Sequence, residues 1–433
     1  MEHRREDIFY NQNMITSGQS ILRELDVNEC EVAELEYVLG SACGGGWGGD
    51  RSDHRSLLFP GDQKSYAVKL VYDAKHRLKD ALAGPALNED QLTEIKRRIV
   101  TDLRTVEALR VGNWVLFAPI PVTGVFRYLD DFQILPVPEK APRPNYLLAD
   151  HPFLLQFKYI GSQHPFVDSR RRISRGIELE LLLAGLISSH IHGNRDQSSQ
   201  WVVPPRPQIN IEVGAHREVT SMLCQRCYVY PELKGVLGDF TPIGACSSLR
   251  LIPSAEFQNR LGISGGQVLD LPENFGESIS AYHHLTGDQK MRFGNACHWV
   301  QHSARTFRDS QSASYIALAL AIESLMPVPE SGKVCACCRR DIGKGPTQRF
   351  KEFVGQFAPE IKLNGAEAKR LYKIRSKLAH GQALFISDRE LFAPALGSFE
   401  DWQNGDRLHR VVRTVLANWL QVHVRAAAAS PQA

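Results

Sequence analysis

The spacing of apolar and polar residues divides the chain into an N-terminal part with strand patterns and a C-terminal part with helix patterns. In the first part, short apolar runs separated by proline and glycine predict strands at 114–117, 125–128, 132–135 and 153–160. Two helices are predicted there, at 88–109 and 168–191. The glycine-rich run 44–49 predicts a flexible loop. These patterns predict a mixed α/β or α+β region over about the first 270 residues.

After Pro272 the pattern changes to that of helices. Apolar residues recur every three or four positions, and the predicted helices are 287–303, 310–326, 347–357, 366–380 and 405–427. Helices joined by short or medium connections predict one helical bundle. We therefore expect a multidomain chain with an α+β regulatory region at 1–150, a second α+β segment at 151–272 and an all-α bundle at 273–433.

The composition is that of a folded protein without a membrane span. Of the 433 residues, 43% are apolar and 9% aromatic, which is enough for buried cores and excludes a disordered or fibrous protein. No apolar run reaches the roughly 18 residues that a membrane-spanning helix needs, and the N-terminus is charged. The nine cysteines, an odd number, argue against a disulfide framework. We expect a soluble, cytoplasmic protein.

Charge is distributed unevenly along the chain. Residues 1–275 carry 30 Lys and Arg against 34 Asp and Glu, whereas residues 276–433 carry 21 against 14. A basic C-terminal part is what a module that handles a polyanion needs, although this excess is also compatible with an ordinary protein surface.

The strongest chemical candidate lies at the end of the predicted helix 366–380. Arg375 and His380 are five positions apart, which separates them by about 140° around a helix, but both can border one cleft where the last turn bends into Gly381. A helix C-terminus favours protonated imidazole, which suits His380 to acid–base chemistry near neutral pH. The spacing alone also fits a histidine that caps carbonyls beside an ion-paired arginine.

The wider context of this motif resembles the HEPN superfamily, and more closely its Apea-like branch, which is common in prokaryotic defence proteins. The resemblance covers 310–381, with the apolar helix 317–325, the run Cys335-Ala-Cys-Cys338, the segment Arg349-Phe-Lys-Glu-Phe and the run 372–381. Many members of the superfamily are metal-independent endoribonucleases that work as dimers, and arginine and histidine side chains of both subunits act on RNA through its own 2′-OH. The resemblance therefore implies cleavage of RNA, such as tRNA or mRNA, to 2′,3′-cyclic phosphate ends by a homodimer. It also implies a toxin or an antiviral effector of abortive infection.

The resemblance also assigns roles to the two main side chains. Arg375 would clamp the phosphate through bidentate hydrogen bonds, and His380 would move the proton. No catalytic cofactor is required. Active members of the family often have an amide, an acid or a histidine directly after the arginine, whereas this chain has Ser376.

Three further residues are candidates for supporting roles. Lys373 and Lys377 could guide the RNA backbone in a salt-dependent way, or form a solvated helix face. Glu323 lies among apolar residues, where an unpaired acid is costly, so it could orient Arg375 or His380. It could equally be a surface position of its helix.

Two Cys-x-x-Cys pairs are candidate ligands of a structural zinc ion, which needs four ligands. Cys335 and Cys338 form the first pair, and Cys224 and Cys227 form the second, less favoured one. Residues that could complete a local site with the first pair are His298, His302 and Cys337. Reduced structural thiols are the alternative.

Together these features predict a C-terminal ribonuclease that the N-terminal region holds in check until an unknown trigger, or the loss of an antitoxin, releases it. One alternative is a catalytically inactive HEPN-like bundle that binds RNA or a nucleotide, or only dimerises. Another is an active N-terminal region for which the bundle is a scaffold.

Overall fold

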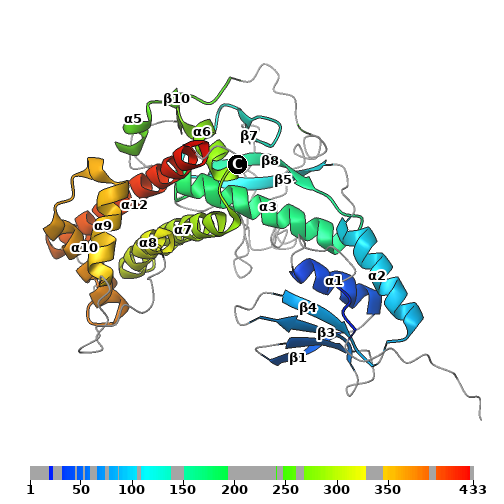
Figure 1. Ribbon diagram of the computed structural model, residues 1–433. Coiled ribbons are helices and arrows are strands. Elements are labelled where there is room, and N and C mark those ends of the chain that lie inside the picture. The colour runs from blue at the N-terminus through cyan, green and yellow to red at the C-terminus, as the bar shows by residue number, and fades with distance from the viewer. Residues whose placement is uncertain are drawn as a thin grey trace, which may run out of the picture. The chain divides into compact units, whose positions relative to one another are not determined.

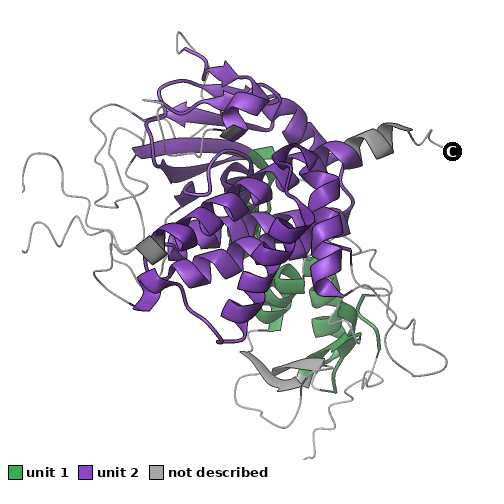
Figure 2. Cartoon of the chain, turned by 90° about the vertical axis from the view of Figure 1, so that its left-hand side faces the viewer, with its two compact units in different colours: residues 1–110, 158–175 green, residues 111–157, 176–433 purple. Residues whose placement is uncertain are grey.

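The computed structural model divides the chain into two compact units (Figure 2). Unit 1 comprises 1–110 and 158–175, and unit 2 comprises 111–157 and 176–433. The predicted boundaries after residues 150 and 272 do not coincide with this division, because two strands and one long helix contribute residues to both units. The residues that the structure describes are 19–22, 32–43, 46–51, 54–58, 66–73, 78–85, 87–104, 109–137, 151–193, 240, 247–259, 268–327, 345–389 and 396–429.

Unit 1 is a four-stranded antiparallel sheet, in the order β1-β2-β3-β4, with helices packed on it (Figure 1). Its elements are α1 (Val32–Cys43), β1 (Gly46–Arg51), β2 (His54–Leu58), β3 (Tyr66–Tyr72), β4 (Leu78–Ala83), α2 (Glu89–Arg104) and the first part of α3 (Pro165–Leu186). The core joins Leu35 of α1, Leu70 of β3 and Ile99 of α2. Arg171 of α3 adds a bidentate ion pair with the buried Glu34 of α1, at 2.9 and 3.0 Å.

Two sequence predictions for unit 1 are wrong. The glycine-rich run 44–49 is not wholly a loop, because Gly46–Arg51 pairs with β2 as an edge strand. The helix that begins after Asn88 ends at Arg104, and Leu109 begins the next strand.

The sheet of unit 2 has the strand order β6-β7-β8-β5-β9. Its strands are β5 (Leu109–Ala118), β6 (Phe126–Tyr128), β7 (Phe132–Pro136), β8 (His151–Ile160) and β9 (His192–Gly193). Side-chain amides form a chain of hydrogen bonds across the sheet, in which the buried Gln133 donates to the buried Gln156 and Gln156 donates to Asn113, each at 2.7 Å. The second half of α3 packs closely against this sheet at Gly176, where a Cβ atom would overlap the Trp114 ring. The predicted strands at 114–117, 125–128, 132–135 and 153–160 are therefore present.

Among its other described residues, unit 2 has a set of helices and the short parallel pair β10 (Leu251–Ile252) and β11 (Leu271–Pro272) (Figure 1). The helices are α5 (Ser254–Asn259), α6 (Phe275–His283), α7 (Gly287–Thr306), α8 (Gln311–Leu325), α9 (Pro346–Phe357), the 3-10 turn η2 (Pro359–Ile361), α10 (Gly365–Ala379), α11 (Ile386–Arg389) and α12 (Leu396–Ala429). Helices α7 and α8 pair along their length, and α12 packs against α6, α8 and α9. The five predicted helices are confirmed, although the last begins at Leu396 rather than at 405.

The core of the helical part is formed by the apolar stripe of α12. Leu408, Val411, Val415 and Trp419 are buried, and the Trp419 ring stacks on Phe293 of α7 at 5.8 Å. Sheets therefore occupy the N-terminal half and helices the C-terminal half, as the hydrophobic pattern predicts. None of the helices in the described segments combines the length and apolar character needed to cross a membrane.

Candidate functional site

Helix α10, which carries the Arg-x4-His motif, has well-defined ends. At its start the Asn364 side chain accepts hydrogen bonds from the amides of Ala366 and Glu367, and the Glu367 carboxylate accepts one from the Asn364 amide. At its end Gly381 adopts a left-handed φ of 66°. The amide of Gln382 then bonds to the Lys377 carbonyl at 2.9 Å, as in a Schellman motif. The predicted role of Gly381 as the residue that ends the helix is confirmed.

Arg375 is fixed by an acid from the neighbouring helix. Its Nη2 lies 2.8 Å from Oε2 of Glu323 in α8, and the two side chains are only 20% and 23% exposed. The guanidinium also lies over the ring of Tyr372, with 5.7 Å to the ring centroid. Glu323 is expected either to orient Arg375 or His380 or to be a surface position of its helix, and in the structure its carboxylate contacts Arg375.

Not every polar atom of this ion pair is hydrogen-bonded. Within the described residues, the buried atoms Oε1 of Glu323 and Nε of Arg375 have no hydrogen-bond partner. Burial and the nearby Glu323 charge raise the pKa of Tyr372, whereas Arg375 opposes the shift. A buried polar atom without a partner costs free energy, so both atoms favour the arrival of a further polar group.

His380 lies elsewhere on the surface. It is the C-cap residue of α10, with φ −93° and ψ 8°, and its side chain is exposed. The chain turns away only at Gly381, so the last turn does not bring His380 towards Arg375, and the helical separation of about 140° persists. Among the described contacts, no hydrogen bond joins these two side chains.

The exposed face of α10 that carries His380 is basic. Lys369, Lys373 and Lys377 are exposed and follow one another at intervals of four residues. At 100° per residue, the three lysines and His380 fall within an arc of about 80°. Lys373 and Lys377 therefore share the face of His380 rather than that of Arg375. Ser376, next to Arg375 in the chain, is half-buried.

Two further arginines, which the sequence patterns do not single out as site residues, bind the end of α8 close to Glu323. Arg292 of α7 donates to the carbonyls of Ser324 and Leu325, and Arg349 of α9 donates to the carbonyl of Pro327. Cations at a helix C-terminus are favourable, because the last carbonyls lack helical partners. Guanidinium groups from α7, α9 and α10 thus converge on residues 323–327, where Glu323 supplies the acid. The sequence gives no signal for this, because the three arginines are far apart in the chain.

The predicted zinc ligands Cys335, Cys338, Cys224 and Cys227 lie outside the described residues, as does Cys337. His298 and His302 lie one turn apart on α7, with ring centroids 6.1 Å apart. Within the described part of the chain, no group of three or more His, Cys, Asp or Glu side chains is arranged to hold a metal ion.

The region defined by α8 and α10 thus offers two adjoining features. One is the group of arginines around the end of α8, which is suited to an anion. The other is the basic face of α10 that ends in an exposed imidazole. Comparison with protein-family models, with curated proteins and with solved structures gives no significant match to this chain.

Proposed function

We propose that the chain is a metal-independent endoribonuclease of the HEPN type, with Arg375 and His380 as its catalytic residues. The observation that carries the proposal is the convergence of Arg292, Arg349 and Arg375 on the end of α8, beside a helix that ends in an exposed histidine. A role as a regulated toxin or an antiviral effector follows from the family resemblance alone.

The proposed reaction requires a cationic clamp and a proton carrier. The 2′-oxygen of RNA forms a bond to phosphorus, the bond from phosphorus to the 5′-oxygen breaks, and the products are a 2′,3′-cyclic phosphate and a 5′-hydroxyl. His380 would carry the proton from the 2′-hydroxyl to the departing 5′-oxygen, directly or by exchange with water. Arg375 would stabilise the additional negative charge on the phosphorane. The lysine row of α10 would hold the RNA backbone, with an affinity that falls as salt rises.

The separation of the two side chains around α10 bears on how the site is assembled. Arg375 points to Glu323, whereas His380 points to solvent with the lysines. One copy of the chain therefore presents the two groups on different faces of one helix. We propose that a homodimer brings His380 of one copy towards Arg375 of the other, which agrees with the family resemblance.

The test is RNA cleavage in EDTA, with total RNA and labelled tRNA, by the wild type, His380→Gln and Lys362→Gln. Loss of general acid–base catalysis is expected to slow His380→Gln by roughly 10²- to 10⁴-fold. Lys362 is exposed outside the lysine row, so its variant is expected to cleave like the wild type. New ends are analysed for cyclic phosphate. Equal cleavage by His380→Gln and wild type would refute the assignment.

The ion pair between Arg375 and Glu323 favours a second candidate function, RNA binding without cleavage. In this case the Glu323 carboxylate keeps its hydrogen bond to Nη2 of the guanidinium that would otherwise clamp the phosphate. Binding without cleavage predicts salt-dependent RNA affinity in the wild type and no new RNA ends. Unchanged affinity in His380→Gln, with no cleavage by either protein, would establish the binding function in place of the enzymatic one.

A further inference from the structure

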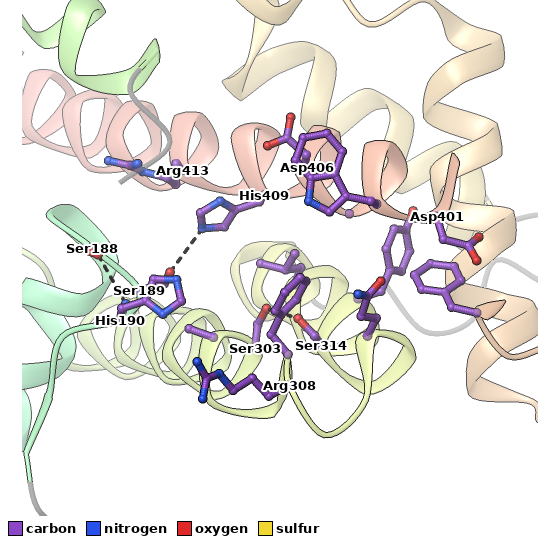
Figure 3. Close-up of a pocket in the computed structure, with 18 residues that line it drawn as sticks. Ser188, Ser189, His190, Ser303, Arg308, Ser314, Asp401, Asp406, His409 and Arg413 are labelled. Carbon is purple, nitrogen blue, oxygen red and sulfur yellow. Dashed lines mark hydrogen bonds between the residues drawn. The ribbon is translucent and has the colours of Figure 1, made fainter. Parts of the chain in front are cut away.

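Unit 2 contains a cavity of about 700 Å³ (Figure 3). Its lining does not include Glu323, Arg375 or His380, the residues of what is called here the α8–α10 site. Helices α7, α8 and α12 and the turn before β9 form its walls. The volume lies within the range of small-molecule sites. The lining residues are Ser188, Ser189, His190, Ser303, Ala304, Phe307, Arg308, Gln311, Ser314, Tyr315, Leu318, Phe385, Asp401, Trp402, Gly405, Asp406, His409 and Arg413.

One end of the cavity gathers imidazole and guanidinium groups. Figure 3 shows His190 and His409 facing each other across this end, with Arg308 and Arg413 beside them. Nε2 of His409 lies 3.4 Å from the Ser189 hydroxyl. Arg413 is 8% exposed and donates to the Ile187 carbonyl, whereas Arg308 is exposed at the cavity wall.

Burial and the neighbouring positive charges suppress protonation of both histidines. Burial, followed by the charges of Arg413, His190 and Arg410, lowers the pKa of His409 to about 3. Burial, followed by the charges of His192 and Arg308, lowers the pKa of His190 to about 4. Both imidazoles are therefore neutral at pH 7, and the arginines give this end a positive potential that favours an anion.

Part of the cavity lining is aromatic. Phe307, Tyr315, Phe385 and Trp402 contribute rings to the lining. Tyr315 and Phe385 meet edge to face, with centroids 5.4 Å apart, and the Tyr315 hydroxyl donates to the Leu371 carbonyl. Rings held in this way offer a preformed surface for another planar ring.

Of the two carboxylates that line the cavity, Asp401 lies away from the imidazole end, whereas Asp406 lies beside His409 on α12. Asp401 lies at the opposite end of the cavity in Figure 3, where it accepts a hydrogen bond from the Ile386 amide at 2.9 Å. Asp406 pairs with Arg410 on the same helix, at 3.0 Å. Imidazole and guanidinium groups thus lie at one end of the cavity and Asp401 at the other, so a ligand with a negative charge on one side of a ring would have one preferred orientation.

We propose that this cavity binds a small aromatic anion, a planar ring that carries a carboxylate or a phosphate group. The anionic group lies between His190, His409 and Arg308, and the ring lies among the aromatic side chains. This site does not depend on the proposed ribonuclease function, because none of its lining residues belongs to the α8–α10 site.

The test compares two probes that differ in charge. The fluorescent 1-anilinonaphthalene-8-sulfonate is an aromatic anion, and N-phenyl-1-naphthylamine is its neutral analogue. The full-length wild type is expected to bind one sulfonate probe per chain. Loss of a charge-assisted hydrogen bond in Arg308→Gln is expected to weaken this binding roughly 10- to 100-fold and to leave the neutral probe within about twofold. The proposal would be overturned if Arg308→Gln bound the sulfonate probe, like the neutral probe, as tightly as the wild type does.

Arg305→Gln is the matched control, because Arg305 is an exposed arginine in the last turn of α7, three positions before Arg308, and does not line the cavity. It is expected to bind the sulfonate like the wild type, and an equal loss in the two arginine variants would attribute binding to general surface charge and overturn the proposal. Arg308 is exposed, so folding is expected to survive its replacement. As a second variant, Ala304→Phe fills the cavity and should abolish binding of both probes.

Competition distinguishes the two kinds of anionic group. Displacement of the sulfonate probe by adenosine monophosphate supports a phosphate ligand, and displacement by benzoate supports a carboxylate ligand. If neither displaces the probe at millimolar concentration, the assignment of an aromatic anion is wrong.

Discussion

The two cavity histidines make the stability of unit 2 depend on pH. In the folded chain the pKa of His409 is about 3 and that of His190 about 4, against 6.5 for an unperturbed histidine. The unfolded chain therefore takes up protons first as the pH falls below 6.5. Because protons then favour the unfolded state, the free energy of unfolding decreases from pH 6.5 down to the folded-state pKa values. Above pH 6.5 both states hold neutral imidazoles, and this contribution is absent.

The size of the effect follows from the shifts. One pH unit corresponds to about 1.36 kcal/mol for each group that protonates only in the unfolded state. Between pH 7 and pH 5, each histidine therefore lowers the free energy of unfolding by about 2 kcal/mol, or about 4 kcal/mol for the pair. This is a large part of the stability of a typical domain.

The assay is urea denaturation at pH 7 and pH 5, followed by the fluorescence of tryptophans that include the buried Trp419. The double variant with His190→Gln and His409→Gln should lose most of the pH dependence. Any packing defect affects it equally at both pH values and therefore cancels in the difference.

The control for this experiment is His284→Gln, because His284 is exposed at the end of α6 and its removal leaves the cavity unchanged. This variant should retain the pH dependence of the wild type. If the double variant also retains it, burial of the two imidazoles is not its cause and the reasoning is wrong.

Three substitutions test the packing and the helix ends of unit 2. Gly185→Ala places a Cβ atom against the buried sulfur of Cys297 and should lower the free energy of unfolding by about 1–3 kcal/mol. In thermal denaturation, adding Cys297→Ala should restore part of this loss. Strictly additive effects of the two substitutions would contradict the contact. Asp388→Ala removes the carboxylate that accepts hydrogen bonds from the first two amides of α8 and should lower the free energy of unfolding by about 1–3 kcal/mol. Hydrogen exchange of these two amides should become faster, and unchanged exchange would contradict the prediction. Gly381→Ala places a side chain at φ 66° and should cost about 1 kcal/mol in urea denaturation, whereas an unchanged midpoint would show that the end of α10 tolerates it.

The ends of helices α8 and α10 can be predicted from the sequence. Ser310 and Asn364 accept hydrogen bonds at the starts of α8 and α10, and Gly381 ends α10. Each of these signals acts over three or four residues, so it can be recognised without the fold. The run 44–49 was misjudged because glycine carries no side-chain pattern, and its strand is defined by pairing with β2.

The partners of the candidate residues were decided by tertiary structure. Arg375 and Glu323 are 52 positions apart, so their ion pair depends on how α8 and α10 pack. The helical spacing in the sequence already separates Arg375 from His380 by about 140°, but only the structure shows that Arg375 pairs with Glu323.

The sequence by itself determined the change from strands to helices along the chain, the apolar stripe of α12 and the position of the Arg-x4-His motif at a helix end. Only the tertiary structure decided that His190 and His409, 219 positions apart in the printed numbering, share one cavity with Arg308. The physical reason is that backbone hydrogen bonds and hydrophobic periodicity operate within a few residues. Cavities and ion pairs form where elements distant in the chain are packed together.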